Sequence, residues 1–256
     1  MKRAMLLLLS CLWWNSSLAA EQLVQLDTRP GVTQRLLLLE PAGKPVASLI
    51  LFTGGDGVLR LGDDGRLGAG AGNFLVRTRQ LWVEQGFQVA VVDAPSDHPD
   101  SISRGDFRSS AEHAQDMAVV IDTLRQRADV PVWLVGTSRG TTSAAAVAIR
   151  LHDKVGGVVL TSTINHDRGN VAAMALEQLT QPVLVVQHRH DQCKETLYQN
   201  VQAVMDGLHA ASATELMLFD GGQDKGDPCQ PWAAHGYNGI ETEVVGKIAS
   251  WIRQHR

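Results

Sequence analysis

The stretch Val132-Trp133-Leu134-Val135-Gly136-Thr137-Ser138-Arg139-Gly140 decides the fold of this 256-residue chain. An apolar run leads into a G-x-S-x-G pattern, and the small-residue segment 141–149 follows it. A serine placed between a strand and a helix in this way is typical of a nucleophile held on a sharp turn. The flanking glycines are needed because a Cβ atom there would collide with the neighbouring strand or helix. The pattern therefore predicts that Ser138 is catalytic, in preference to an ordinary Gly-Ser turn.

Short apolar runs alternate with longer amphipathic segments over most of the chain. We expect strands at 35–39, 47–52, 88–92, 132–135, 157–161, 183–186 and 215–219, and helices at 73–85, 108–127, 141–151, 171–179, 194–205 and 240–253. Nearly continuous apolar strands such as Leu49–Phe52 suit a sheet that is covered on both faces. The sequence therefore predicts one α/β domain, a mainly parallel sheet with helices on both faces. Only about twenty residues separate the strands that end near Thr161 and begin at Val183, too few for a large cap domain.

Composition excludes several classes of partner. Hydrophobic residues make up 44% of the chain, charged residues 20%, and the formal net charge is −4. A negative chain is a poor ligand for nucleic acid or an anionic membrane surface, so neither is expected as a partner. Segment 54–72 holds eight glycines in nineteen residues, but it lacks the lysine of a phosphate-binding loop. We interpret it as a mobile flap beside the active site, with an inert surface loop as the alternative. No metal or organic cofactor is implied.

The first twenty residues have the pattern of a signal peptide. Lys2 and Arg3 precede the apolar run 4–14, and residues 15–20 are small or polar. The apolar run is too short to span a bilayer. We expect cleavage to leave a mature chain, 21–256, in the periplasm or outside the cell, without stable membrane insertion. The alternatives are an uncleaved anchor and a lipoprotein signal ending at Cys11.

A serine nucleophile needs a histidine base and a carboxylate that orients it. Asp191 follows an apolar strand by a few residues and is the first candidate acid, although it could instead cap a helix that begins near Lys194. Asp167, after an earlier strand, ranks second. His235 lies between the last expected strand and the C-terminal helix, beside a glycine. The order Ser138, Asp191, His235 is the chain order of the α/β-hydrolase triad.

On these residues the sequence resembles the α/β-hydrolase family, and among its members the compact dienelactone-hydrolase-like branch. The resemblance covers about 35–253 and implies a single-domain α/β-hydrolase fold without a large cap. It implies Ser138 as nucleophile, His235 as general base and acid, and Asp191 as the residue that holds the imidazole. Serine here replaces the cysteine-type nucleophile of dienelactone hydrolases, so their particular substrate is not carried over.

Acyl transfer also requires donors for the tetrahedral oxyanion. The backbone N–H of Arg139, immediately after the nucleophile, is one expected donor. The second should follow the strand that ends at Phe52, where glycines let the backbone approach the substrate oxygen. Gly54 is the first choice and Gly55 the second, and a plain glycine-rich turn is the alternative.

Two cysteines remain after the expected cleavage, Cys193 and Cys229. An even number in an exported protein predicts a disulfide, although two unpaired buried thiols are the alternative. The bond would join the loop that carries the acid to the loop that carries the histidine. The whole pattern predicts a serine hydrolase that acts on a small-molecule ester or related acyl substrate through an acyl-enzyme. A peptidase or acyltransferase would use the same triad, and a non-catalytic binding protein of the same fold is the alternative from another class.

Overall fold

A computed structural model of the chain describes residues 19–166 and 168–256. Most of the expected signal peptide, with Cys11, and the second candidate acid, Asp167, lie outside the described residues. Within them, no helix has both the length and the apolar character needed to cross a membrane.

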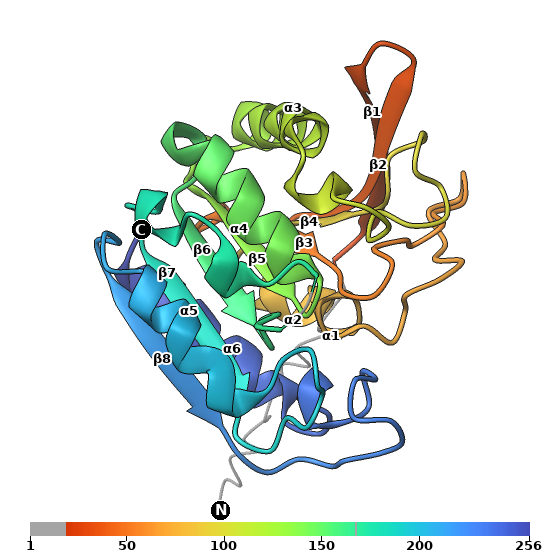
Figure 1. Cartoon of the computed structure of the whole chain (residues 1–256). Helices are drawn as coiled ribbons and strands as arrows, with labels where there is room; N and C mark the ends of the chain where they lie inside the picture. Colours follow the sequence, from red (N-terminus) through yellow and green to blue (C-terminus); the bar gives the residue numbers. More distant parts are fainter. Residues whose placement is uncertain (1–18, 167) are drawn as a thin grey trace, which may run out of the picture.

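One eight-stranded sheet forms the centre of the molecule, in the order β1-β2-β4-β3-β5-β6-β7-β8 (Figure 1). The hairpin of β1 and β2 is antiparallel, and β2 pairs antiparallel with β4. All pairs from β4 to β8 are parallel. The strands are β1 (Glu21–Arg29), β2 (Val32–Leu39), β3 (Ser48–Phe52), β4 (Gln88–Val92), β5 (Val132–Thr137), β6 (Gly157–Thr161), β7 (Val183–His188) and β8 (Thr214–Phe219).

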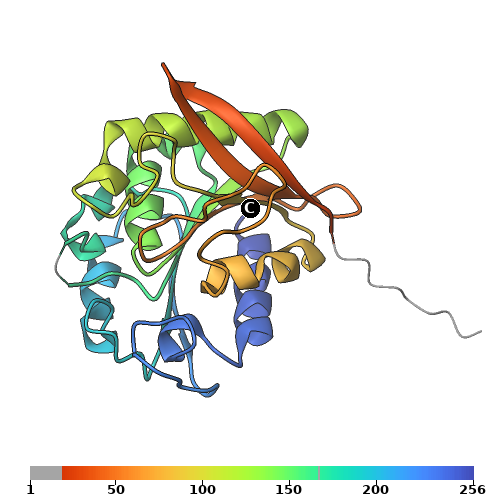
Figure 2. The same cartoon turned by 90° about the vertical axis from the view of Figure 1, so that its right-hand side faces the viewer.

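Helices cover both faces of this sheet (Figures 1 and 2). Helices α1 (Phe74–Arg77), α2 (Arg79–Glu84) and α6 (Glu241–Gln254) pack into one core, and α3 (Ala111–Arg127), α4 (Gly140–Arg150) and α5 (Val201–Gly207) into the other. Successive residues of a strand point to opposite faces. Accordingly Leu49 and Leu51 of β3 belong to the first core, and Ile50 and Phe52 to the second. Each buried side chain of this size stabilises the fold by about 1.5–3 kcal/mol.

The predicted single α/β domain without a large cap is confirmed. Between β6 and β7, the described residues form two short 3-10 turns, η3 (Val171–Ala173) and η4 (Leu176–Gln178), and no longer helix. The carboxyl ends of the parallel strands are therefore covered by loops alone. This is the edge at which open α/β sheets bind their ligands.

Five details of the secondary-structure prediction were wrong. Strand β1 was not predicted, and β2 begins at Val32 instead of residue 35. The helix expected over 171–179 is replaced by the two turns η3 and η4, because Met174 between them has an extended backbone. This extended residue allows both Val171 and Leu176 to be buried in the core. The helix expected from Lys194 begins only at Val201. The helix expected over 73–85 breaks at Thr78, whose hydroxyl donates to the Phe74 carbonyl.

Candidate active site

Ser138 occupies the turn between β5 and α4, at the centre of the sheet edge. Its φ is 52°, a left-handed conformation that costs a residue with a side chain on the order of 1–3 kcal/mol. A Cβ on Gly140 would collide with the Phe52 carbonyl, and one on Gly136 with the backbone of Gly140. Gly140 thus permits the close approach of α4 to β3, and Gly136 the close approach of α4 to its own strand, β5. The local structure has the strand, strained turn and helix that the sequence pattern predicts.

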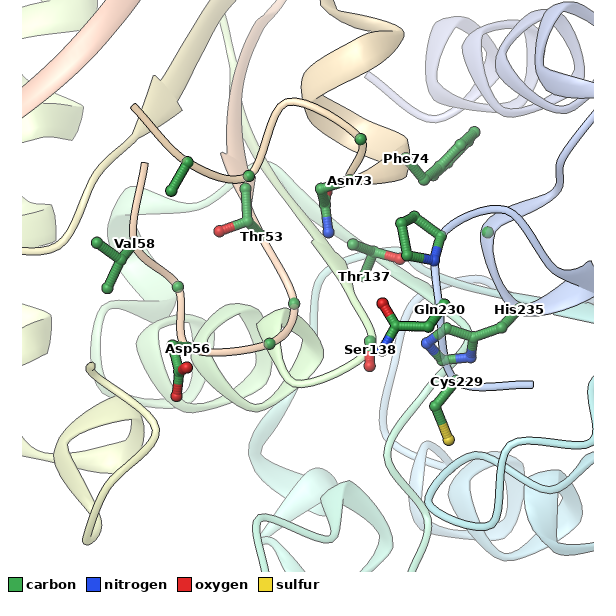
Figure 3. Close-up of a pocket in the computed structure, with 18 of the residues that line it drawn as sticks. Thr53, Asp56, Val58, Asn73, Phe74, Thr137, Ser138, Cys229, Gln230 and His235 are labelled. Atoms are coloured by element: carbon green, nitrogen blue, oxygen red, sulfur yellow. The ribbon is translucent and has the colours of Figure 1, made fainter. Parts of the chain in front are cut away.

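Asp191 and His235 meet above the ends of β7 and β8. Nδ1 of His235 lies 3.1 Å from Oδ2 of Asp191, and both side chains are buried. An ionised carboxylate can only accept, so this geometry fixes the proton on Nδ1 and leaves Nε2 free to accept. His235 and Ser138 line the same pocket (Figure 3). The structure therefore brings together the three residues that the sequence singles out.

The Asp191 carboxylate is held by several other donors. Its Oδ2 accepts from Thr196 Oγ1 at 2.9 Å and from Gln187 Nε2 at 3.1 Å, and its Oδ1 accepts from the Cys193 N–H at 3.0 Å. The Thr196 hydroxyl also lies 3.1 Å from Nδ1 of His235. No helix starts at Lys194, so the alternative role of Asp191 as a helix cap is wrong. Instead, these donors hold the carboxylate in a fixed position, in which Oδ2 also accepts the hydrogen bond from the imidazole.

A disulfide joins Cys193 to Cys229, as predicted. Cys193 lies two residues after Asp191, and Cys229 lines the pocket beside Gln230 and Pro231. The bond therefore connects the acid-bearing loop directly to the segment that leads to His235. A restraint of this kind limits the relative movement of two loops that must hold a hydrogen-bonded pair.

The histidine loop is anchored to the sheet from below by Tyr237. Its buried hydroxyl donates to the Val186 carbonyl at 3.0 Å and accepts from the Ser162 N–H at 3.1 Å. The Ser162 hydroxyl in turn donates to the carbonyl of His235 at 2.8 Å. Burial raises the pKa of Tyr237 above its ordinary value, so this hydroxyl remains protonated. Through Ser162, which follows β6, and Val186 of β7, the sheet thereby fixes the position of the His235 backbone.

The loop after β3 lies against the nucleophile. A Cβ on Gly54 would lie 2.9 Å from Cβ of Ser138 and 3.4 Å from its Oγ, so only glycine permits this approach. Among the described residues, the N–H groups of Gly54, Gly55 and Arg139 donate no hydrogen bond to the protein. These are the three backbone donors that the sequence analysis proposes for an oxyanion, and none of them is used within the described residues. Arg139 follows Ser138 in the chain and Gly54 packs against the Ser138 side chain, whereas a Cβ on Gly55 would meet nothing within 4 Å.

The pocket has a volume of about 440 Å³, and Ser138 is among the residues that line it (Figure 3). Phe74, Val58 and Pro231 supply apolar surface, while Asn73 and Asp56 supply polar groups. Segment 54–72 forms much of the wall. Its Leu59 and Leu61 are buried, and the Asp93 carboxylate accepts from both of their N–H groups. The segment thus lies beside Ser138, where the flap was expected, and it is attached to the sheet through Asp93.

Sequence reasoning missed the residues that hold Asp191 and His235 in place. Thr196, Gln187 and Tyr237 act through buried hydrogen bonds, and no motif marks them. The one available signal was position, because Thr196 and Gln187 flank Asp191 on the same short segment.

The comparisons with known proteins agree with this architecture. No described protein family matches the sequence, and no curated protein does. Solved structures are similar in fold. A cold-adapted esterase from an Arctic intertidal metagenomic library is 16% identical, with a TM-score of 0.64 and coverage of 92% of this chain and 93% of that one. Dienelactone hydrolase from Anabaena variabilis is 15% identical, with a TM-score of 0.64 and coverage of 93% and 99%. A serine hydrolase homologue from Coxiella burnetii is 18% identical, with a TM-score of 0.59 and coverage of 92% and 96%.

A doubly covered, mostly parallel sheet with a serine on the turn after β5 defines the α/β-hydrolase fold. The particular form is the compact one, without a large cap, that this chain shares with dienelactone hydrolase. The solved structures that it resembles are esterases and hydrolases.

Proposed function

We propose that this protein is an exported serine hydrolase that cleaves an ester, or a related acyl compound, through an acyl-enzyme intermediate. The observation that carries the proposal is the 3.1 Å hydrogen bond between Asp191 and His235 beside a pocket that Ser138 also lines. A hydroxyl is a weak nucleophile until a base removes its proton, and an imidazole is an effective base when its other nitrogen is held.

In the proposed reaction, Nε2 of His235 takes the proton of Ser138 Oγ as the oxygen attacks the substrate carbonyl. Asp191 stabilises the imidazolium that forms. The carbonyl oxygen becomes an oxyanion and accepts hydrogen bonds from the N–H groups of Arg139 and Gly54. The N–H of Gly55 is the alternative to that of Gly54. The protonated His235 then donates to the leaving alcohol as the ester C–O bond breaks. Water repeats the sequence on the acyl-enzyme and releases the acid.

The loop-covered site favours small or accessible acyl groups. A pocket of about 440 Å³, bounded by backbone and by Phe74, accommodates a short acyl chain with its leaving group. We expect rates on 4-nitrophenyl esters to fall as the acyl chain lengthens beyond a few carbons.

Export is proposed on two grounds. The pattern of residues 1–20 is that of a signal peptide, and the Cys193–Cys229 disulfide is a bond that persists in oxidising compartments. We expect the mature chain to begin near Glu21, where β1 also begins. Mass spectrometry of the N-terminus after expression in a secreting host distinguishes this product from one lipidated at Cys11.

The experiment that tests the activity is hydrolysis of 4-nitrophenyl esters from acetate to palmitate by wild type and Ser138→Ala. We expect turnover on short esters by the wild type alone. Turnover that survives Ser138→Ala, or none on any ester of the series, would contradict the proposal.

A further inference from the structure

Arg108 is buried directly beneath the loop after β3, with only 5% of its surface exposed. Its Nη2 donates to the carbonyls of Thr53 at 3.0 Å and Gly55 at 3.2 Å. Its Nη1 donates to Ser143 Oγ at 2.9 Å, and its Nε to Ser103 Oγ at 2.8 Å. All four partners are neutral oxygens. Four of the five guanidinium N–H groups therefore have a hydrogen-bond partner, and none of these partners carries a negative charge.

Such an arrangement is unusual, because buried cations are normally paired with a carboxylate. Burial, together with the positive charge of Arg139, lowers the pKa of Arg108 to about 9, and only Asp56 acts in the opposite direction. The guanidinium is nevertheless charged at neutral pH. Its field is thus not cancelled by a salt bridge.

The bond to Thr53 has a direct consequence for catalysis. The carbonyl of Thr53 and the N–H of Gly54 belong to one planar peptide group. When a charged donor binds the oxygen of a peptide, its N–H becomes a stronger donor, because hydrogen bonds in a chain polarise one another. The bonds to Thr53 and Gly55 also fix the loop on both sides of Gly54.

We propose that Arg108 is a positioning residue for the oxyanion hole, which orients and polarises the Gly54 amide that receives the negative charge of the transition state. This inference rests on the function proposed above. The contact with Ser143, on α4, ties the loop to the helix that begins just after Ser138, so both sides of the oxyanion hole share one anchor. Because these dipoles are in place before the substrate arrives, little reorganisation is needed during the reaction.

The test compares Arg108→Gln and Arg108→Lys with a matched control, Arg150→Gln. Arg150 also donates to a backbone carbonyl, that of Ser109, but it is exposed on α4 and does not contact the loop after β3. For each protein, kcat and KM on 4-nitrophenyl acetate are measured together with the inhibition constant of phenylboronic acid. This inhibitor adds to the serine hydroxyl as a tetrahedral anion and so reports the oxyanion hole. Thermal unfolding is followed in parallel.

We expect Arg108→Gln to lower kcat by about 30-fold, somewhat less than the loss of an entire oxyanion donor, with KM changed less than about threefold. Phenylboronic acid should bind more weakly by a similar factor. Arg108→Lys keeps the charge but loses the several N–H donors of the guanidinium. Its kcat and its affinity for phenylboronic acid should therefore lie between those of wild type and Arg108→Gln. If Arg108→Gln does not fold, the comparison of Arg108→Lys with wild type decides the question.

Equal kcat and equal boronate affinity in wild type and the folded Arg108 variants would overturn the proposal. A rise in KM alone, with boronate affinity unchanged, would indicate a merely structural role and overturn it equally. These outcomes differ from failure of the proposed function, in which the wild type itself would show no hydrolysis that depends on Ser138.

Discussion

Thr196 Oγ1 lies 3.1 Å from Nδ1 of His235. The same hydroxyl lies 2.9 Å from Oδ2 of Asp191, so the three side chains contact one another. Thr196 is fully buried, so no water substitutes for it. The hydroxyl donates to the carboxylate and offers a lone pair to the imidazole N–H. The threonine therefore fixes the distance and the angle between the two groups.

Replacing Thr196 by valine should lower kcat by about 10-fold, because the carboxylate and the imidazole lose a shared partner and small misplacements reduce rate steeply. Thr196→Ser keeps the hydroxyl and is the control, with a rate close to wild type. Steady-state kinetics on 4-nitrophenyl acetate measure both. A valine variant as fast as the serine variant would show that the contact is dispensable.

Reduction of the disulfide should lower kcat under conditions in which the protein is still folded. The bond closes a sequence separation of 36 residues, which on the chain-entropy model stabilises the fold by about 4 kcal/mol. Reduction frees the segment around Cys229 to move relative to Asp191 while both hydrophobic cores remain packed. We expect dithiothreitol to lower kcat at concentrations that leave the far-UV circular dichroism unchanged.

Cys229→Ala serves as the control for this experiment, because it already lacks the bond. Its kcat should be low from the start and insensitive to dithiothreitol. Inhibition of this variant by the reductant, or full activity of the reduced wild type, would show that the bond does not restrain the site.

His113 should make the protein sensitive to acid. It is buried on α3, neither ring nitrogen has a hydrogen-bond partner among the described residues, and burial, with the charges of Arg108 and Arg29, lowers its pKa to about 3. The unfolded chain takes up this proton below about pH 6.5, whereas the folded chain does not until about pH 3, so stability falls as pH drops through this window. From pH 7 to pH 5 the loss from this group is about 2 kcal/mol.

Urea unfolding at the two pH values measures the effect, with His113→Leu as the comparison. The leucine variant should lose about 2 kcal/mol less than the wild type between pH 7 and pH 5. An identical pH dependence of the two proteins would mean that His113 is protonated in the folded state.

The centre of the sheet was predictable from the sequence, and its margins were not. The buried parallel strands consist of continuous apolar residues, as in Leu49–Phe52, and this pattern has few other interpretations. Strand β1 was missed because it is an edge strand of mostly polar residues, nearly all of them exposed or half-buried. The Pro30-Gly31 pair at its end, a typical turn, was the signal that could have located the hairpin.

The residues of the candidate site were predictable where chemistry demands a residue type. Ser138, Asp191 and His235 stand out because acyl transfer needs a nucleophile, an acid and a base in a known chain order. Arg108 and Thr196 could not be found in this way, since their roles depend on burial and on partners far apart in the sequence, such as Thr53 for Arg108. Their identification required the three-dimensional contacts.

The role of Ser138 as the nucleophile is tested by the mass of the protein after treatment with a fluorophosphonate. We expect one adduct, on the peptide that contains Ser138, with none on Ser138→Ala and labelling slower by about 100-fold or more on His235→Ala. An adduct on another residue, or equal labelling of wild type and Ser138→Ala, would show that Ser138 is not the nucleophile.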